Sequence, residues 1–380
     1  MKNRSEVVII GSGITGLSIA YSLVNRGCRD ITILDKGHLA SGASTRNGGG
    51  VRAQFATEEN IILSKWSIQR FRRLSLELNT NFWFRQGGYL FLAESDQELS
   101  MLKKAVEFQN RHGLGTKIVD CGQAKDIVPQ MVCPSVVGGA FRKGDGILFP
   151  FPLLFGYAEH LRRNSVAIET HCTVDGIAES STGFSIRTSH GIIEANKVVD
   201  AAGGWSSTVA KMLGVDVPTR PVRHQIMASE PLSPFLDPMI VTLKDGFYMS
   251  QGPRGELVAG ITESNAHGED PGRSGHFFCE QLSKRLVDLF PRLSAARMMR
   301  QWAGFYDMSP DANPILDSIP GVENAFIACG FSGHGFMISP AVGELMACLI
   351  LGERPPFPTD PYRMDRFRLG HTSLETLVIG

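Results

Sequence analysis

The sequence lacks the cysteine patterns that hold metals or clusters. Its seven cysteines are scattered, and none forms a CxxC pair or stands near histidines at metal-ligand spacing. We therefore expect no zinc site, no iron–sulfur cluster and no other metal. Scattered cysteines in an odd number are typical of a reducing compartment, so we expect the protein in the cytoplasm.

The chain also lacks net charge, basic blocks and long apolar runs. Its 38 Lys and Arg balance 38 Asp and Glu, which argues against nucleic acid as a partner. The first apolar run, residues 7–10, ends at a glycine, which predicts a buried strand rather than a membrane span or an export signal. A length of 380 residues, with 43% hydrophobic and 20% charged, predicts an ordinary globular protein of two domains.

What the sequence does have is a glycine fingerprint near its start. The apolar run at 7–10 is followed by GxGxxG, a helical pattern and a second apolar strand that ends in an acid. The glycines allow a tight turn, close approach of a phosphate and packing of the helix on the strand, while the acid can bind ribose hydroxyls. This order predicts a dinucleotide site without a 2′-phosphate; the alternative is a glycine-rich turn with no ligand. The expected contacts are Gly11, Gly13, Ile14, Thr15, Gly16, Asp35 and Lys36.

The fingerprint occurs once. "GLGTKI" at residues 113–118 lacks the third glycine and follows no apolar strand. Enzymes that move hydride from NAD(P)H to a flavin commonly carry two nucleotide sites. A single site therefore favours a small substrate as the electron donor, although the fingerprint itself does not separate FAD from NAD.

Two further stretches of small residues fit the same ligand. Hydroxyls and glycines at residues 41–50 can line a diphosphate and admit a flat ring, although such clusters are also typical of flexible loops. Residues 197–204 form an apolar run followed by small residues, where ligands bind in open α/β sheets. Trp205 either covers the ligand or begins the core of the next helix. The expected contacts are Ser44, Thr45, Arg46, Asn47, Gly48, Gly49, Val174, Ala202, Gly203 and Trp205.

Together these motifs resemble those of the D-amino-acid-oxidase-like FAD-dependent oxidoreductases, the glycine/sarcosine oxidase group. Within that family the chain looks most like the β subunits of heteromeric sarcosine oxidase and of dye-linked L-proline dehydrogenase. The similar stretches occur in the family's order over nearly the whole chain: "VVIIGSGITGLSIAYSL", "SGASTRNGGGVR", "QGGYLFL", "VVDAAGGWS", "PVRHQ", "WAGFYDMSPDANPIL" and "GFSGHGFMISPAVGE".

The resemblance implies an α/β fold in which a Rossmann-like FAD-binding domain carries an inserted α+β substrate domain with a mixed or antiparallel sheet. The FAD-binding domain would be discontinuous, from residues 1–84, 146–219 and 301–380, and the substrate domain would comprise 85–145 and 220–300. Alternating residues at 246–262 predict a hairpin that turns at "GPRGE". Residues 367–380 either dock a partner or pack on their own domain.

The third glycine-rich stretch, residues 330–337, suits the flavin ring. Ser339 and Pro340 are typical of the N-cap and first residue of a helix, so we expect the helix to start there. Its positive end would face the preceding amides, which could donate to the flavin's pyrimidine edge. The alternative is a glycine turn before a packed helix. The expected contacts are Gly330, Gly333, His334, Gly335, Phe336 and Met337.

The family reaction removes hydride from the carbon beside an amine, passes it to FAD at N5 and leaves an imine. The resemblance implies a small secondary amino acid as substrate, of the L-proline, hydroxyproline or sarcosine type. For substrate contacts and catalysis we expect Tyr248, His224 and Arg52, with Glu263 and His334 behind them. Tyr248 offers a hydroxyl, Arg52 can pair with a carboxylate, and His224 can bind carboxylate or accept a proton if its pKa is near neutral. Each could equally be a structural residue.

Four positions depart from the family's patterns. Monomeric sarcosine oxidases have a lysine that promotes reaction with oxygen where this chain has Val258, and a flavin-tethering cysteine where it has Gly304. Met337 replaces a second lysine, and Pro150 stands where heteromeric sarcosine oxidases link FMN to histidine. We therefore expect non-covalent FAD and electron transfer to a partner subunit or carrier. A non-covalent FMN at a subunit interface is left open. The alternatives are an oxygen-using amino acid oxidase and a non-catalytic flavin-bearing scaffold subunit.

Overall fold

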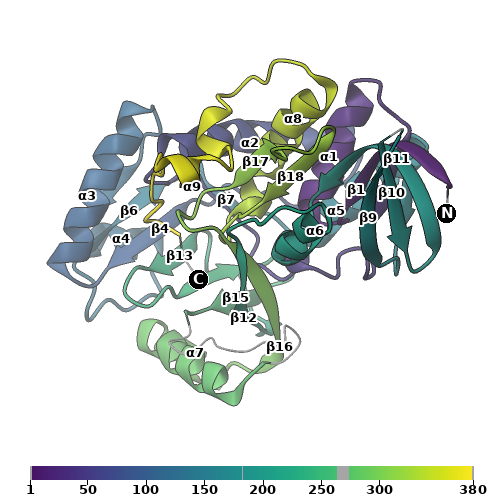
Figure 1. Cartoon of the computed structure of the whole chain (residues 1–380). Coiled ribbons are helices and arrows are strands. Elements are labelled where there is room, and N and C mark those ends of the chain that lie inside the picture. The colour runs from purple at the N-terminus through teal and green to yellow at the C-terminus, as the bar shows by residue number, and fades with distance from the viewer. Residues whose placement is uncertain (1, 182, 263–273, 379–380) are drawn as a thin grey trace.

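The computed structural model describes residues 2–181, 183–262 and 274–378, and Glu263 lies outside them. Two eight-stranded sheets organise this part of the chain, with helices packed on both (Figure 1). A two-stranded sheet, β3 (Gly50–Val51) with β7 (Gly146–Ile147), joins segments far apart in sequence. No helix in these ranges is long and apolar enough to cross a membrane.

The first sheet has the central parallel strands that the fingerprint predicts. Strand β1 pairs in parallel with β2 and β11, and its side chains alternate between two cores. Val7 and Ile9 face one helical layer, whereas Val8 and Ile10 face the other side. Both faces are therefore covered, as a central parallel strand requires. The strands in spatial order are β17 (Ile315–Ser318), β18 (Ala325–Cys329), β11 (Gly191–Asp200), β1 (Arg4–Ile10), β2 (Ile31–Leu34) and β8 (Ala167–Glu169).

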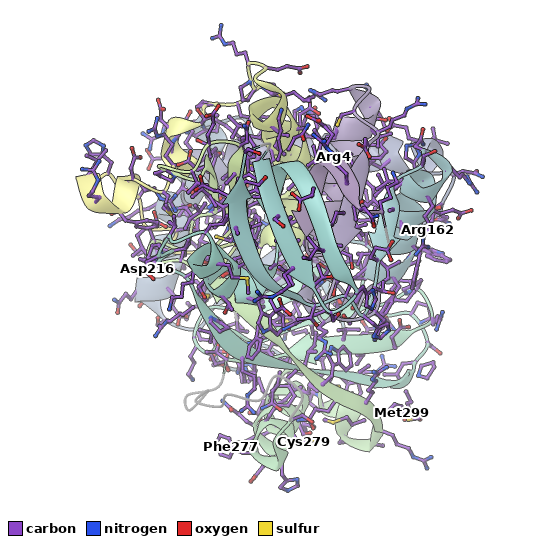
Figure 2. All side chains as sticks on the ribbon, turned by 45° about the vertical axis from the view of Figure 1, so that its right-hand side comes forward. Arg4, Arg162, Asp216, Phe277, Cys279 and Met299 are labelled. Carbon is purple, nitrogen blue, oxygen red and sulfur yellow. The ribbon has the colours of Figure 1, made fainter. Side chains whose placement is uncertain are left out.

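Helices α1 (Ile14–Asn25), α2 (Glu58–Glu77), α5 (Pro150–Arg163) and α8 (Gly335–Leu351) share one apolar core with this sheet. On the other face, β11 continues into an antiparallel meander with β10 (Gly183–Thr188) and β9 (Val174–Ser180), seen face-on in Figure 2. Helix α6 (Ser206–Met212) packs beside this meander. The short helices of this part are η1 (Ala43–Thr45), η2 (Gly203–Trp205), η4 (Asp360–Tyr362) and α9 (Arg366–Leu369).

The second sheet is mixed, because β13 and β4 pair in parallel and the other neighbours are antiparallel. Strands β14 and β15 form the predicted hairpin, which turns at residues 252–255. The strands in spatial order are β16 (Met298–Met308), β12 (Arg220–Pro231), β15 (Glu256–Gly260), β14 (Tyr248–Gln251), β13 (Met239–Thr242), β4 (Tyr89–Ala93), β6 (Gly138–Arg142) and β5 (Lys117–Val119).

Helix α7 (His276–Leu289) closes one face of the second sheet through Phe278, Leu282 and Leu286. Phe277 of α7 and Met299 of β16 are exposed at the far end of the molecule (Figure 2). The remaining helices of this region are α3 (Asp96–Arg111), α4 (Cys121–Ile127) and η3 (Pro291–Ala295).

Two expectations need correction. Strand β16 pairs with β12 as far as Met308, so residues 301–308, expected in the FAD-binding domain, lie in the second sheet. Helix α8 begins at Gly335, five residues before the expected start, and holds Pro340 inside it. Pro340 lacks the N–H that would bond the carbonyl of Phe336, and the Ser339 hydroxyl donates to that carbonyl instead, at 2.9 Å. The helix therefore continues through Pro340, although the local sequence Ser339-Pro340 is typical of a helix N-terminus.

Candidate active site

The first glycine loop has no room for side chains. Gly11 has φ of +113°, and a Cβ there would lie 2.3 Å from the carbonyl oxygen of Ala201. A Cβ at Gly16 would lie 2.0 Å from the carbonyl oxygen of Gly11. These contacts bring β1, α1 and the end of β11 together as closely as backbone allows.

The loop at residues 41–49, which is rich in Ser and Thr hydroxyls, lies over the start of α1. Ser44 Oγ accepts a hydrogen bond from the backbone N–H of Ile14 at 2.9 Å, and Gly13 packs beside the same hydroxyl. Thr15 is buried in the first turn of α1, and Thr45 donates to the carbonyl of Ala40. The structure thus places the first two predicted segments on one helix N-terminus, where phosphates bind.

The residues expected to bind the ribose of the dinucleotide also lie close together. Asp35 accepts hydrogen bonds from the backbone N–H and the hydroxyl of Ser12, both at 2.7 Å. Its carbonyl accepts from the N–H of Cys172 at 2.8 Å, which brings the segment leading to Val174 alongside. Asp35 is therefore held against the glycine loop, where a ribose hydroxyl would lie.

Trp205 is not a core residue. The residue is 36% exposed, and Lys36 Nζ lies 3.5 Å from the centroid of its ring. The neighbouring Ala202 and Gly203 follow β11, as predicted. Trp205 therefore stands over the ribose end together with Lys36, a position consistent with covering a ligand.

The segment 46–50 connects the two sheets. Arg46 donates to the carbonyl of Ala303 on β16, and the hydroxyl of Ser250 on β14 donates to the carbonyl of Gly48 at 3.0 Å. Asn47 folds the loop on itself by accepting from the N–H of Gly49 at 2.8 Å. Residues 46–50 therefore link the glycine loop at residues 11–16 to the second sheet.

A pocket opens where this segment meets the N-terminus of α8 and the second sheet. The N-cap His334 makes no side-chain hydrogen bond to α8, so the helix's first amides are available to a ligand. The pocket is lined by Asn47, Gly48, Gly50, Arg52, Tyr89, Met239, Tyr248, Tyr306, Ser332, Gly333, His334, Phe336, Met337 and Val378.

Arg52 is a buried cation in this pocket. It is 3% exposed, and its guanidinium lies 3.9 Å from the ring centroid of Phe55 and donates to the carbonyls of Gln54 and Leu377. Burial lowers the pKa of Arg52. Among the residues that the structure describes, no carboxylate forms an ion pair with it. A buried guanidinium with no carboxylate in direct contact keeps N–H donors for a ligand, so Arg52 suits an anionic ligand.

Tyr248 lines the pocket together with Tyr306 and Tyr89. Burial raises the pKa of all three hydroxyls, that of Tyr89 to about 12. They therefore stay protonated at neutral pH and can donate hydrogen bonds. The family stretch "WAGFYDMSPDANPIL" contains Tyr306, but a tyrosine on an alternating strand carries no signal that separates it from core.

His224 lies behind the tyrosines rather than on the pocket wall. Its ring stacks on Tyr306 with centroids 4.8 Å apart and on Tyr248 at 5.8 Å. Burial lowers the pKa of His224 to about 4, so the near-neutral pKa considered from sequence is wrong. A neutral imidazole in this position can orient the tyrosines but offers no charge to a carboxylate.

His334 does line the pocket. Burial first, and then the charge of Arg52, lower its pKa to about 3, so the ring is neutral. Gly333 beside it has φ of +88°, and a Cβ there would lie 2.6 Å from the Tyr306 ring. Gly330, with φ of +71°, lies deeper, where its N–H donates to buried Asp307. The glycine-rich stretch is therefore shaped by its contacts with β16.

Sequence reasoning missed the pocket residues Tyr89, Met239, Tyr306, Ser332 and Val378. Each comes from a strand or loop whose partner is distant in sequence. The register of the second sheet brings Tyr89, Met239 and Tyr306 to Arg52 and Tyr248, whereas Ser332 precedes α8 and Val378 follows α9. No local pattern would have found Val378.

A profile of the FAD-dependent oxidoreductases (DAO) matches residues 6–349, about nine-tenths of the chain. The chain belongs to this family. The match confirms the resemblance, and the α/β fold agrees with it. It specifies FAD and gives no support to a second flavin, so we do not propose FMN.

Members of the FAD-dependent oxidoreductase family match along almost all of the chain. The sarcosine oxidase subunit beta of Rhodobacter capsulatus is 29% identical over 385 aligned residues, covering 100% of this chain and 92% of its own. The crystal structure of L-proline dehydrogenase from P. horikoshii is 32% identical, with a TM-score of 0.92 over 97% of this chain and 99% of that one. Glycine oxidase from Geobacillus kaustophilus, at 24% identity and a TM-score of 0.90, shares the fold.

The residues present fit FAD. The glycine loop packs backbone against backbone at the N-terminus of α1, where a diphosphate would bind, and Asp35 is held at the expected ribose end. At the other end, α8 offers its N-terminus to the pocket, where negative charge on a reduced flavin would be stabilised. These two ends come from opposite ends of the sequence and meet through packing of α1 against α8.

Proposed function

We propose that the chain oxidises a small secondary amino acid, of the L-proline, hydroxyproline or sarcosine type. FAD, when bound, accepts the hydride from the carbon beside the amine, and an imine results. The resemblance to L-proline dehydrogenase and to sarcosine oxidase subunit beta supports this substrate class. The role of the chain's own residues is to bind, orient and desolvate the amino acid.

The charge of the pocket carries the proposal. Among the described residues that line it, Arg52 alone has a formal charge. A carboxylate would pair with this guanidinium, and the hydroxyls of Tyr248, Tyr306 and Tyr89 stand on the same wall to donate hydrogen bonds. One cation on an otherwise uncharged wall matches an amino acid held by its carboxylate.

The same pocket has nothing to hold an ammonium group by charge. No Asp or Glu lines it within the described ranges, and His224 and His334 are neutral. We infer that the amine binds as the free base. The free base is also the reactive form, because its lone pair assists loss of hydride from the adjacent carbon.

Electron transfer to a partner subunit or carrier, rather than to oxygen, completes the proposal. It is supported by Val258, an uncharged residue on β15 where the resemblance implies a lysine in oxygen-using relatives. The name of the Rhodobacter relative, a subunit, supports a protein partner. Gly304 packs against Arg46, with 3.1 Å from its ideal Cβ position to Arg46 Cβ, and offers no thiol to a flavin, which supports non-covalent FAD.

A substrate panel tests the activity. The flavin-loaded protein is mixed anaerobically with L-proline, hydroxyproline, sarcosine and primary amino acids, and loss of flavin absorbance is followed. We expect reduction by a secondary amino acid far faster than by any primary one. No bleaching by any amino acid would contradict the proposal and favour a scaffold subunit. The acceptor is tested separately below.

A further inference from the structure

Residues 373–378, which we call the closing segment, pack on their own active site. After α9 the chain turns back toward β4 and β13 (Figure 1). Leu377 is 1% exposed and joins the core beside Tyr89 and Tyr248, and Val378 lines the pocket. Of the two alternatives for this stretch, the structure shows packing on the same chain.

One buried carboxylate anchors the closing segment. Glu375 is 3% exposed and accepts hydrogen bonds from the N–H groups of Ala56 and Thr57 and from the Thr57 hydroxyl, at 2.9 to 3.1 Å. Asn60 donates to it at 3.3 Å. Ala56 and the N-cap Thr57 immediately precede α2 and Asn60 lies in its first turn, so the carboxylate lies at the positive end of this helix. No Lys or Arg of the described chain forms an ion pair with Glu375.

The carboxylate and Arg52 are joined by a single residue. Leu377 receives a hydrogen bond from Arg52 on its carbonyl and donates its N–H to Glu375 Oε1 at 2.9 Å. The charge of Glu375 favours the protonated form of Arg52. The two buried charges thus compensate each other without touching.

Glu375 reaches Arg52 only through Leu377, and this leaves the guanidinium free to bind a ligand. A carboxylate in contact with Arg52 would occupy the N–H groups that face the pocket and would neutralise the charge there. A carbonyl takes one N–H, fixes the plane of the guanidinium and leaves other donors free.

We propose that Glu375 is a positioning residue for substrate binding. Through Leu377 it holds Arg52 in the orientation that receives the substrate carboxylate. This inference rests on the proposed function, in which Arg52 binds that carboxylate. It gives the closing segment a part in substrate affinity, although Glu375 itself does not line the pocket.

The probe for the test is pyrrole-2-carboxylate, a planar ring acid, with pyrrole as the same ring without the charge. Dissociation constants are measured by titration calorimetry on the flavin-loaded protein. Glu375→Gln keeps the side-chain size but replaces an oxygen that accepts with an amide that donates. We expect it to weaken binding of pyrrole-2-carboxylate about tenfold and that of pyrrole less than twofold.

Two further variants keep the test sharp. Leu374→Gln changes an exposed residue of the same segment, 63% accessible, and should leave both constants unchanged. A chain ending after Thr376 keeps the contacts of Glu375 with Ala56, Thr57 and Asn60 but removes Leu377 and Val378. It should weaken binding of pyrrole-2-carboxylate at least as much as Glu375→Gln does. If both the Glu375→Gln and the shortened protein bind it within twofold of the unaltered protein, the inference is wrong.

Arg52→Met separates this failure from that of the proposed function. If Arg52→Met weakens the acid strongly but Glu375→Gln does not, Arg52 binds carboxylate and only the positioning role fails. If Arg52→Met binds pyrrole-2-carboxylate as tightly as the unaltered protein does, and binding of pyrrole is also unchanged, then Arg52 does not bind the carboxylate and the proposed function fails.

Discussion

The imidazole of His224 stacks on the ring of Tyr306, with centroids 4.8 Å apart and planes 22° from parallel. In the sequence His224 looks like a catalytic residue. The contact with Tyr306 places it outside the wall of the pocket instead. It supports a tyrosine of the pocket from behind, and burial lowers its pKa to about 4. The imidazole is therefore neutral throughout the range in which the protein would work.

The first prediction follows from that neutral ring. Flavin reduction by the amino acid should rise with pH through the amine of the substrate and show no inflection from His224. His224→Gln should slow reduction several-fold, because Tyr306 loses its support, while the shape of the pH profile stays the same. Rapid mixing between pH 6 and 9 measures both. Loss of an ascending limb in the variant would show that His224 does accept a proton.

Arg52→Lys tests whether the several N–H donors of the guanidinium are needed, because lysine keeps the positive charge. Lysine keeps a cation but cannot bond the carbonyls of Gln54 and Leu377 while presenting two donors to a carboxylate. We expect kcat/KM for the amino acid to fall by roughly 10- to 100-fold. Oxidation of a cyclic amine without the carboxylate should change less than threefold. Arg162→Lys, at an exposed arginine labelled in Figure 2, is the matched control and should have no effect.

Gly333→Ala tests the contact between the glycine-rich stretch and β16. A Cβ there would lie 2.6 Å from the Tyr306 ring, and φ is +88°. Gly352→Ala, with φ of +70° and no atom within 4 Å of the added Cβ, carries the backbone strain without the clash. We expect Gly352→Ala to lower stability by about 1 kcal/mol and to keep activity. Gly333→Ala should in addition lose most flavin reduction, and equal activity of the two variants would refute the role of this contact.

Asp307 predicts a pH dependence of stability. Burial raises its pKa to about 7, so the folded chain holds a proton that the unfolded chain releases near pH 4. The stability from this protonated carboxyl is full below pH 4 and is lost as pH rises through 7. Relative to Asp307→Asn, which never ionises, the protein should lose about 3 kcal/mol between pH 5 and 8. Denaturant titrations at the two pH values measure this; a constant difference would contradict the buried, protonated state.

Local sequence patterns were sufficient to predict the strand, turn and helix that begin the first sheet. The glycine at residue 11 and Asp35 stand where strand, turn and helix geometry dictate, and the hairpin at 252–255 follows from alternation and a glycine-rich turn. The start of α8 was misplaced because Ser339 and Pro340 carry start signals locally. The hydroxyl of Ser339 in fact satisfies the carbonyl that the proline leaves free.

The substrate pocket was less predictable for a physical reason. Tyr306 and Met239 reach it through pairings between strands far apart in sequence. Val378 reaches it through the anchor at Glu375, whose partners lie more than 300 residues earlier. Such placement depends on register and long-range hydrogen bonds, which no window of the sequence contains.

The measurement that tests the central claim most directly follows the flavin through one turnover. The loaded protein is reduced anaerobically with its best secondary amino acid and then mixed with air-saturated buffer, alone or with an artificial electron acceptor. We predict fast reduction, slow return of flavin absorbance in air and rapid return with the acceptor. Rapid reoxidation in air with stoichiometric hydrogen peroxide would contradict the dehydrogenase account and make the protein an oxidase.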